Sequence, residues 1–452
     1  MKSKKLKKIA LINPKGAERC NQDLIMQDIF PDIRDDIVLI GDDTEFVPHL
    51  GLLTIASLLP DDVELEYIDE EYIPLDMVEE KVFRGDFDLV CLSAYNPQAF
   101  RAYEIARRYR RRNIPVIMGG LHVSGIPEEA AQQVDSVFIG EAEYTFKQFL
   151  KDFKKGEAKK YYVSEKPVDL ADSPPPRFDI IENFPMYNKI PLIATRGCPH
   201  SCDFCIFPVA YHGEYRHKPV EQVIAEIESA KKLHPRPFIS FSDENMLADR
   251  EYSRELVGAL IDLDIPWECY CDIGIAGDDV LLELMAKSNC KLAQIGFETL
   301  DPENLRNVDA WKYNQVVNYP RSIKKIQSAG IPVMAMFMAG FDGDDPGVFN
   351  RLKKFIISNR IREIDFAIMT PMPGTPLYRK LKSQGRIISE NWNHYTWTHV
   401  NFQPNKMTAG ELQEGPLRLF KYFTDKAGEM AMKKGGFIPK QAFHIKMMGH
   451  TR

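Results

Sequence analysis

The sequence predicts an α/β protein with three parts: a doubly wound parallel sheet, an incomplete parallel barrel and a mainly helical C-terminal cap. Short apolar segments alternate with helical segments twice along the chain, a pattern typical of parallel sheets with helices on their faces. The two series are separated by Asp172-Ser-Pro-Pro-Pro-Arg177, whose prolines cannot continue a helix or a central strand. From about residue 385 the alternation stops, and this change marks the beginning of the cap.

The composition bounds the kinds of function that the chain can have. Its 452 residues suggest about three domains, and hydrophobic and charged fractions of 44% and 27% are those of a globular protein. A net charge of −7 argues against nucleic-acid binding through phosphate contacts, and no apolar run reaches the length of a membrane span. The basic segment Lys2–Lys8 lacks the apolar core of a signal peptide. The eight cysteines are therefore expected to be reduced thiols or metal ligands in the cytoplasm.

The first series of segments, within residues 1–155, predicts the doubly wound domain. Sheets of this kind bind ligands beyond the carboxyl ends of their strands, where the strand order reverses. Gly119, Gly120, Gly140 and Glu141 follow two of the strands, and glycine lets the backbone approach a flat cofactor closely. The alternative is a scaffold with an empty pocket, because a fold does not dictate a ligand. The expected strands are residues 8–13, 63–68, 89–93, 115–118 and 136–139, with helices near 51–59, 75–84, 98–112, 127–133 and 143–154.

The second series, residues 188–384, predicts the barrel, after a proline-rich linker at 156–187 and before a cap at 385–452. Six strand–helix units suit an incomplete parallel barrel, in which chemistry takes place at the carboxyl ends of the strands. The expected strands are residues 191–194, 238–241, 267–271, 292–296, 332–338 and 364–369, with helices between them such as 219–233 and 250–263.

Three cysteines, Cys198, Cys202 and Cys205, follow the first barrel strand at a C-x3-C-x2-C spacing. Thiolates are the usual ligands of iron–sulfur clusters, which normally need four of them. With three, one iron keeps an open position, where a metal centre can take a substrate. The alternative is a structural zinc site completed by one of the histidines nearby, since three cysteines and one histidine are an ordinary zinc set. The strand-end polar groups of the surrounding chain favour the cluster.

The cysteine spacing, with the aromatic Phe204 before the third cysteine, resembles the defining motif of the radical S-adenosylmethionine (SAM) superfamily. The resemblance implies a 4Fe-4S cluster held by the three cysteines, whose open iron binds the amino and carboxylate groups of SAM. In that family the reduced cluster cleaves SAM to a 5′-deoxyadenosyl radical.

Other strand ends match the same family. Ser242-Asp-Glu-Asn245 resembles its F-x-D-(D/E)-N stretch, which implies that Asp243 and Asn245 border the SAM pocket. Glu298 stands where members place a contact to the ribose of SAM, and Thr370–Thr375 looks like the family's P-x-P-G-T turn. For Asp243 and Asp249 the alternative is a helix cap, a common role of acids at strand ends.

The first domain resembles the Rossmann-like, cobalamin-binding domain found ahead of many radical SAM modules. The matching segments are Gly119–Ser124, Pro127–Ala130, Gly140–Glu143 and Pro48–Leu53, and His122 is counted with them as a loop residue more than as a cobalt ligand. The D-x-H-x-x-G motif, by which some such domains supply a histidine to cobalt, is absent from the sequence. A residue near Tyr95 or Asn96, after the third strand, is expected to face cobalamin instead.

The remaining cysteines and the cap carry weaker signals. Cys269, Cys271 and Cys290 are interpreted as buried small hydrophobes and not as a second cluster. In the cap, His394, Tyr395 and His399 are candidate substrate or proton-transfer groups, and a packed cap without chemistry is the equal alternative; a helix follows near 408–433.

This architecture is similar to that of cobalamin-dependent radical SAM enzymes, which include class B methylases, hopanoid methylases and the anaerobic magnesium-protoporphyrin ester cyclase. The resemblance implies that one SAM yields a radical that takes hydrogen from an unactivated carbon, and that a methyl group from a second SAM passes through cobalamin to that carbon. It also implies a small-molecule or lipid substrate and an electron donor such as flavodoxin or ferredoxin. Two alternatives stay open: a radical enzyme that does not methylate, performing ring closure, oxidation or carbon–carbon coupling, and a zinc-stabilised binding module without catalysis.

Overall fold

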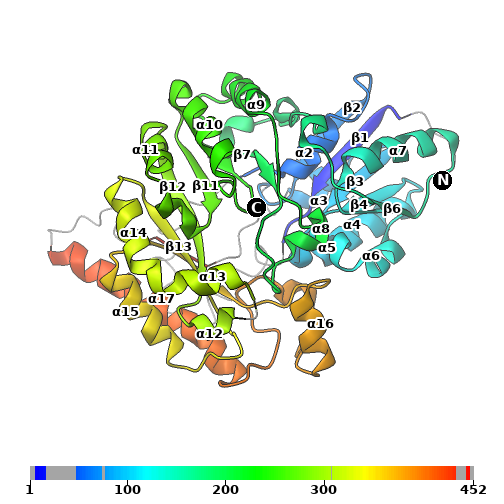
Figure 1. Ribbon diagram of the computed structural model, residues 1–452. Coiled ribbons are helices and arrows are strands. Elements are labelled where there is room, and N and C mark those ends of the chain that lie inside the picture. Colours follow the sequence, from blue (N-terminus) through cyan, green and yellow to red (C-terminus); the bar gives the residue numbers. More distant parts are fainter. Residues whose placement is uncertain (1–5, 17–46, 74–76, 307, 434–443, 448–452) are drawn as a thin grey trace.

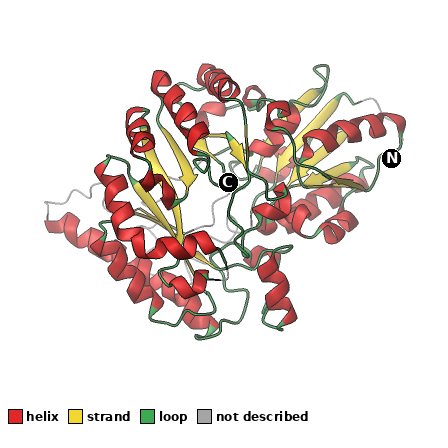
Figure 2. Ribbon diagram, viewed as in Figure 1, coloured by secondary structure: helices red, strands yellow, loops and turns green. Residues whose placement is uncertain are grey.

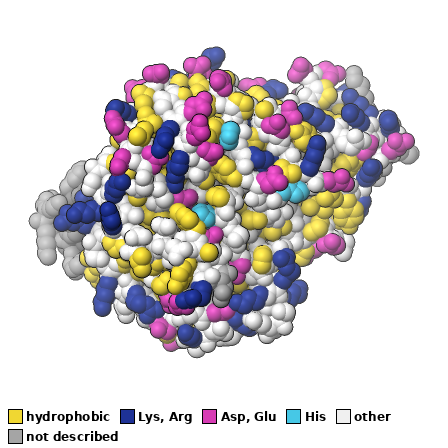
Figure 3. All heavy atoms as spheres, viewed as in Figure 1, with side chains coloured by type: hydrophobic (Ala, Val, Ile, Leu, Met, Phe, Trp, Pro, Cys, Tyr) yellow, Lys and Arg dark blue, Asp and Glu magenta, His cyan; other side chains and the backbone are white. Residues whose placement is uncertain are grey.

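A computed structural model describes residues 6–16, 47–73, 77–306, 308–433 and 444–447. Two parallel sheets lie side by side, with helices on their outer faces (Figures 1 and 2). The start of the basic segment Lys2–Lys8, and the end of the cap at 448–452, lie outside the described residues. Among the helices that are described, none is long and apolar enough to cross a membrane. Basic and acidic side chains are interspersed over the face drawn in Figure 3.

The first sheet is doubly wound, as predicted. Its strand order is β2-β1-β3-β4-β5-β6, so the direction of winding reverses between β1 and β3. Each pair of neighbouring strands is parallel. The strands are β1 Lys8–Asn13, β2 Glu64–Asp69, β3 Leu89–Ser93, β4 Val116–Gly119, β5 Ser136–Ile139 and β6 Tyr161–Val163.

Helices cover both faces of this sheet because its buried strands are apolar on both sides. Alternate residues of β1 enter different cores: Ile9 and Leu11 pack with α2 and α7, whereas Ala10 and Ile12 pack with α3 and α4. The helices are α2 Leu50–Ala56, α3 Val78–Phe83, α4 Ala99–Arg111, α5 Leu121–Gly125, α6 Pro127–Gln133 and α7 Ala142–Lys155.

The structure extends the first sheet beyond the boundary expected at residue 155, because β6 pairs with β5 from within the expected linker. The rest of the linker is packed against the barrel. It forms three short 3-10 turns, at Leu170–Asp172, Phe178–Ile180 and Phe184–Met186. The rings of Phe178 and Phe184 stack 5.0 Å apart and belong to the barrel core.

The second sheet contains the six predicted barrel strands and one more. Its order is β15-β14-β13-β12-β11-β10-β7, parallel throughout. The added strand, β15, comes from the segment expected to be mainly helical. The strands are β7 Ile190–Leu192, β10 Ile239–Phe241, β11 Trp267–Cys271, β12 Cys290–Glu298, β13 Val333–Ala339, β14 Glu363–Ile368 and β15 His444–Met447.

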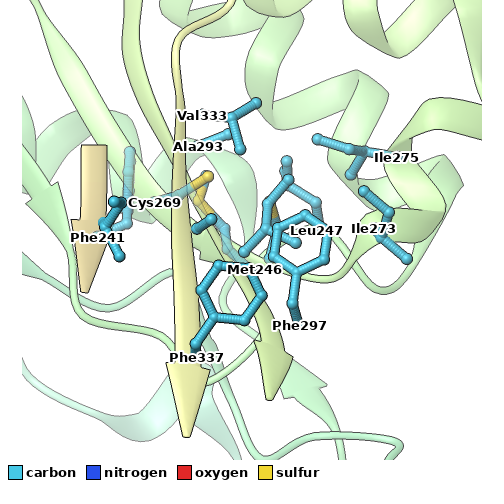
Figure 4. Close-up of a cluster of buried hydrophobic side chains, with 14 of the residues drawn as sticks. Phe241, Met246, Leu247, Cys269, Ile273, Ile275, Ala293, Phe297, Val333 and Phe337 are labelled. Atoms are coloured by element: carbon cyan, nitrogen blue, oxygen red, sulfur yellow. The ribbon is translucent and has the colours of Figure 1, made fainter. Parts of the chain in front are cut away.

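Helices surround the barrel strands, and two further helices follow the last predicted strand. Inside, Phe241, Cys269 and Phe297 pack with other apolar side chains (Figure 4). Cys269 thus lies where a small hydrophobe would. The helices between strands are α9 Val220–Leu233, α10 Arg250–Leu260, α11 Asp279–Lys287, α12 Pro302–Leu305, α13 Ala310–Gln315, α14 Tyr319–Ser328 and α15 Val348–Ser358, and those after β14 are α16 Pro376–Ser383 and α17 Ala409–Lys433.

Candidate active site

The three cysteines lie on a loop between two short elements. β8, Thr195–Arg196, precedes them and pairs antiparallel with β9, Arg216–His217. After Cys205 the chain enters α8, Phe207–Tyr211, which lies beside α5 of the first domain (Figure 1). Burial raises the pKa of Cys202 and of Cys205 to about 12, so both are neutral thiols until a metal displaces their protons.

The donor set fits a cluster better than a single zinc ion. Among the described residues, no three His, Cys, Asp or Glu side chains meet at one point where a metal ion would sit. A cluster needs no such point, because each thiolate binds a different iron. The histidines near the loop have other contacts: His200 lies 3.5 Å from Asp272 and 3.4 Å from Asp309, and the ring of His217 stacks on Tyr252 at 4.1 Å.

Acidic residues after β10 fix the backbone that leads into the cysteines. Asp243, 0% exposed, accepts hydrogen bonds from Thr195 Oγ1 at 2.6 Å, from the Ala194 amide at 3.1 Å and from the Thr195 amide. Glu244 accepts one from the Gly197 amide at 2.9 Å. Burial raises the pKa of Asp243 to about 6. Asp243 thus contacts the loop before the cysteines and acts by positioning it. Asp249 caps α10 through the amides of Glu251 and Tyr252.

Gly197 is required by the path of this loop. Its φ is +89°, and a Cβ there would meet the carbonyl oxygen of Glu214 at 2.0 Å. A side chain at this position would therefore push β8 away from the segment before β9.

Asn245 reaches the cluster loop. Its Nδ2 donates to Asp272 Oδ2 at 2.8 Å and lies 3.8 Å from Cys198 Sγ. Burial would raise the pKa of Asp272, but the nearby His200 and the hydrogen bond from Asn245 outweigh it and lower that pKa to about 2. Asp272 directly follows β11, and it was not singled out from the sequence because no motif like the one around Asp243 surrounds it.

Glu298 lies at the end of β12 and is paired with a lysine. Its Oε1 accepts a hydrogen bond from Lys312 Nζ at 2.5 Å, and both side chains are nearly buried. Burial lowers the pKa of Lys312, but the Glu298 carboxylate outweighs it, so the pKa lies well above the ordinary value. Glu298 itself has a φ of +61°, which directs its side chain across Gly296. Nothing in the sequence around α13 pointed to Lys312.

The aromatic residue of the cysteine motif and the turn after β14 pack around the same loop. The ring of Phe204 meets Phe341 edge-on at 6.1 Å. The backbone before Phe341 is held by Asp344, which accepts from the amides of Gly340 and Phe341 at 2.9 and 3.1 Å. At the start of α16, the amide of Leu377 donates to the Asp203 carbonyl at 3.0 Å.

A cavity lies between the two domains, at the carboxyl ends of β3, β4 and β5. Of the cobalamin residues predicted from the sequence, Tyr95, Gly119, Gly120, Gly140 and Glu141 line it. The barrel domain supplies another part of the wall, including Arg196, Tyr211 and Glu244.

Glycine at position 120 keeps this cavity open. Gly120 has a φ of +100°, and a Cβ there would meet the backbone oxygen and nitrogen of Ala94 at 2.7 and 2.8 Å. The backbone can therefore turn directly from β4 into α5. A largely apolar cleft at a strand-order reversal, with close backbone on one side, fits a flat cofactor such as cobalamin.

Two predicted cobalamin residues do not line the cavity. His122 is fully buried, because its neighbours Leu121 and Ser124 take the cavity side of α5. Its Nε2 lies 2.7 Å from the Tyr103 hydroxyl, and burial lowers its pKa to about 3. Asn96 is also buried and outside the lining. These two side chains therefore pack inside the domain.

His49 lines the cavity and was not singled out from the sequence. Its Nδ1 accepts a hydrogen bond from the Leu52 amide at 3.3 Å, which caps α2. Burial lowers its pKa to about 4, so the ring is neutral near pH 7. The neutral tautomer with Nδ1 as acceptor carries its proton on Nε2, and His49 is thus a hydrogen-bond donor at the cavity wall.

The cap contacts the first domain through Trp392, whose indole donates to Glu129 at 2.8 Å. Tyr395 is fully buried and its hydroxyl donates to the Ser389 carbonyl at 2.9 Å, so it is a packing residue. His394 and His399 stack at 5.1 Å, and His399 Nδ1 lies 2.8 Å from Thr396 Oγ1.

Comparison with known proteins agrees with both halves of this site. The family model for the radical SAM superfamily matches residues 192–356, and that for the B12 binding domain matches residues 37–150. Bacteriochlorophyllide d C-12(1)-methyltransferase of Chlorobaculum tepidum is 28% identical over 379 residues, covering 82% of this chain and 81% of the relative. Hopanoid C-2 methylase of Rhodopseudomonas palustris is 26% identical, covering 78% of this chain and 68% of the relative.

Solved structures share the fold. The radical SAM methyltransferase TsrM from Kitasatospora setae, with cobalamin and a 4Fe-4S cluster bound, superposes with a TM-score of 0.64 at 16% identity, over 84% of this chain and 78% of that one. OxsB, a cobalamin-dependent SAM radical enzyme with aqua-cobalamin bound, superposes with a TM-score of 0.66 at 16% identity, over 95% of this chain and 68% of that one. The chain belongs to the cobalamin-dependent radical SAM enzymes, with a 4Fe-4S cluster, SAM and cobalamin as its cofactors.

Proposed function

We propose that this enzyme transfers a methyl group to an unactivated carbon atom of an apolar, ring-containing metabolite, with tetrapyrroles as the first class to test. The observation that carries the proposal is the cavity whose wall is shared by the glycine-lined strand ends of the first domain and the barrel residues around the cluster loop. When bound, the cluster and SAM supply a radical that removes a hydrogen atom, and cobalamin supplies the methyl group.

The residues of the chain hold and orient these groups. Cys198, Cys202 and Cys205 hold the cluster, and Asp243 with Glu244 fixes the loop on which they lie. Glu298, paired with Lys312, accepts hydrogen bonds from the ribose of SAM. Gly119, Gly120 and Gly140 let the backbone of the first domain approach cobalamin, and the apolar wall keeps water from the reacting carbon.

The substrate class follows from relatives. Two methyltransferases that are each 28% identical to this chain are named for bacteriochlorophyllide d, and hopanoid C-2 methylase is named for a polycyclic lipid. The proposal includes an electron donor of the flavodoxin or ferredoxin type and a cytoplasmic location, where free thiols stay reduced.

A second candidate is radical chemistry without methyl transfer. The anaerobic magnesium-protoporphyrin IX monomethyl ester cyclase of Rubrivivax gelatinosus is 24% identical over 78% of this chain. In that case the cavity of the first domain would still hold cobalamin, but no methyl group would leave SAM for the substrate.

The test uses protein produced and reconstituted anaerobically and passed through a gel-filtration column. Its absorption spectrum gives the cobalamin retained per chain. Incubation with SAM, a reductant and candidate tetrapyrroles or polycyclic lipids should give 5′-deoxyadenosine, S-adenosylhomocysteine and a product heavier by one methyl group. 5′-Deoxyadenosine without S-adenosylhomocysteine would favour the second candidate, and protein without retained cobalamin would contradict the first.

A further inference from the structure

Arg196 joins the cluster loop to the first domain. It lies two residues before Cys198, and its guanidinium crosses to the beginning of α7. Nη1 donates to Glu141 Oε1 at 2.6 Å, and Nη2 donates to Glu143 Oε1 at 2.9 Å. The two terminal nitrogens of one guanidinium group therefore bind two carboxylates of the first domain.

The two carboxylates are held in place by further contacts. Glu141 Oε1 also accepts from Arg216 Nη1 at 3.1 Å, and Arg216 is the β9 partner of Arg196. Glu141 Oε2 accepts from the Val168 amide at 3.0 Å, and Glu143 Oε1 from Ser173 Oγ at 3.1 Å. Two guanidinium groups thus meet two carboxylates, so the group is neutral as a whole.

Little water reaches these ion pairs. The Arg196 side chain is 10% exposed, and those of Glu141 and Glu143 are 0% and 5% exposed. Removing one partner of such a pair leaves a buried charge without compensation. Lysine cannot replace arginine fully here, because one ammonium does not match two carboxylates in fixed directions as a guanidinium fork does.

The same tripeptide, Thr195-Arg196-Gly197, is tied to the barrel through its backbone. Asp243 binds Thr195, and Glu244 binds the Gly197 amide. The barrel therefore holds the residues on either side of Arg196, while the first domain holds the Arg196 side chain. Arg196, Glu141 and Glu143 all line the cavity between the domains. A single ion-paired group therefore connects the cofactor cavity to the first cysteine.

We propose that Arg196 is a positioning residue that sets the cluster loop at a fixed separation from the cobalamin cavity, and that this separation couples SAM cleavage to methyl transfer. The inference rests on the proposed function. Without the ion pairs, Asp243 and Glu244 still hold the loop on the barrel, so the cluster forms and SAM is cleaved. The substrate carbon, however, would no longer lie at the distance from the cobalamin cavity that methyl transfer would need.

The variants are Arg196→Gln, Arg196→Lys, Glu143→Gln and the double variant of Arg196→Gln with Glu143→Gln. The matched control is Lys189→Gln, which breaks a nearly buried ion pair with Glu268 at 2.7 Å within the barrel. If Arg196 and Glu143 act through each other, the double variant should show no larger effect in any of the readouts below than Arg196→Gln alone.

The first readout needs no cofactor and no activity. Hydrogen exchange of the apoprotein should be faster in Arg196→Gln than in the parent chain, at the segments 140–150 and 195–205 together, and unchanged there in Lys189→Gln. Unchanged exchange at both segments in Arg196→Gln would overturn the proposal whatever the enzyme does.

The second readout uses reconstituted protein loaded with cobalamin. Electron paramagnetic resonance of the reduced cluster beside cob(II)alamin should show a spin–spin interaction that weakens in Arg196→Gln and partly returns in Arg196→Lys. With substrate, methylated product should fall about 100-fold in Arg196→Gln, the cost of a misplacement of about 1 Å, while 5′-deoxyadenosine forms at close to the parent rate. Equal loss of both products, or an unchanged spin–spin interaction, would assign Arg196 a purely structural role.

Failure of the proposed function would look different. The parent chain would then retain no cobalamin or form no S-adenosylhomocysteine, and the hydrogen-exchange comparison would still decide whether Arg196 holds the loop.

Discussion

The carboxylate of Glu298 lies 2.5 Å from the ammonium of Lys312, in a buried pair beside the three cysteines. Each partner compensates the charge of the other, and Lys312 fixes the direction in which Glu298 presents its free oxygen. The orientation of the Glu298 carboxylate is therefore fixed before any ligand binds beside it.

Replacing Lys312 with Met should weaken SAM binding to the reconstituted protein about 10- to 100-fold, the usual worth of a hydrogen bond to a charged group. Glu298 would lose the cation that holds it and, with it, its fixed direction. Equilibrium binding of SAM measures the change. Lys325→Met breaks an exposed pair with Asp279 and should leave SAM affinity as it is; equal loss in both variants would contradict the role of Lys312.

Replacing Cys198, Cys202 or Cys205 with Ala should abolish the brown iron–sulfur absorption, because three thiolates are already the minimum for the cluster. Iron and sulfide analysis after anaerobic reconstitution checks this. Cys290→Ala is the control: it should keep full iron content and lose about 1 kcal/mol of stability, since Cys290 is a buried apolar neighbour. Zinc bound in place of iron and sulfide would contradict the assignment.

Asp243→Asn should lower the iron content reached on reconstitution. The new Nδ2 donor would take the place of Oδ2, face the Ala194 amide and find no acceptor there, at a cost of about 1–3 kcal/mol. The cysteine loop would then lose its fixed start. Asp249→Asn, at an exposed helix cap, should reconstitute normally. Full iron content in Asp243→Asn would show that the loop holds its shape without this carboxylate.

Gly120→Ala should reduce cobalamin retention, because the added Cβ would meet the Ala94 backbone at 2.7 Å and displace the β4–α5 turn at the cavity wall. Gly330→Ala is matched in backbone conformation, with φ of +86°, but its Cβ meets nothing within 4 Å. Both variants should lose about 1–3 kcal/mol of stability from the unfavourable φ, and only the first should lose cobalamin. Equal retention would place the cofactor away from this turn.

The stability of the protein should fall on acidification partly through His122. Its pKa is about 3 in the folded state against 6.5 ordinarily. Between these values the unfolded chain binds more protons, so the free energy of unfolding decreases as the pH falls, by at most about 1.4 kcal/mol per pH unit. Denaturant unfolding between pH 7 and 5 should show a shallower decrease for His122→Phe than for the parent chain, while exposed His212→Asn should follow the parent. Equal slopes would refute the burial of a neutral ring.

Most of the predicted strands were found because they are largely buried; the edge strand β2 is the partly exposed exception. β1 and β3 are continuous apolar runs, and both begin and end where the sequence places them. β6 and β15 were missed for the opposite reason: in β6 only Tyr162 is buried, and β15 is four residues long at the sheet edge. Short edge strands carry too little apolar pattern to be recognised.

The site residues also fall into those that the sequence predicted and those that it did not. The cysteines follow from local spacing, whereas Asn245 and Glu298 follow from the resemblance of two strand ends to the radical SAM superfamily. The structure gathers these residues around one loop. Lys312 and Arg196 act through partners 14 and 55 residues away, so no local pattern marks them. Asp272 follows a predicted strand, but its partner Asn245 lies 27 residues away. His122 and Asn96 were expected at the cavity because they follow strand ends, but one turn of helix directs each into the domain interior.

The ion pairs of Arg196 also affect the order in which parts of the protein fold during synthesis. Glu141 and Glu143 leave the ribosome 55 and 53 residues before Arg196. During that interval both carboxylates lack their cation from the barrel, and burying them would be costly. The nascent first domain should therefore keep the start of α7 hydrated while its sheet forms, and the cofactor cavity should take its final shape only after the cysteine loop has been made.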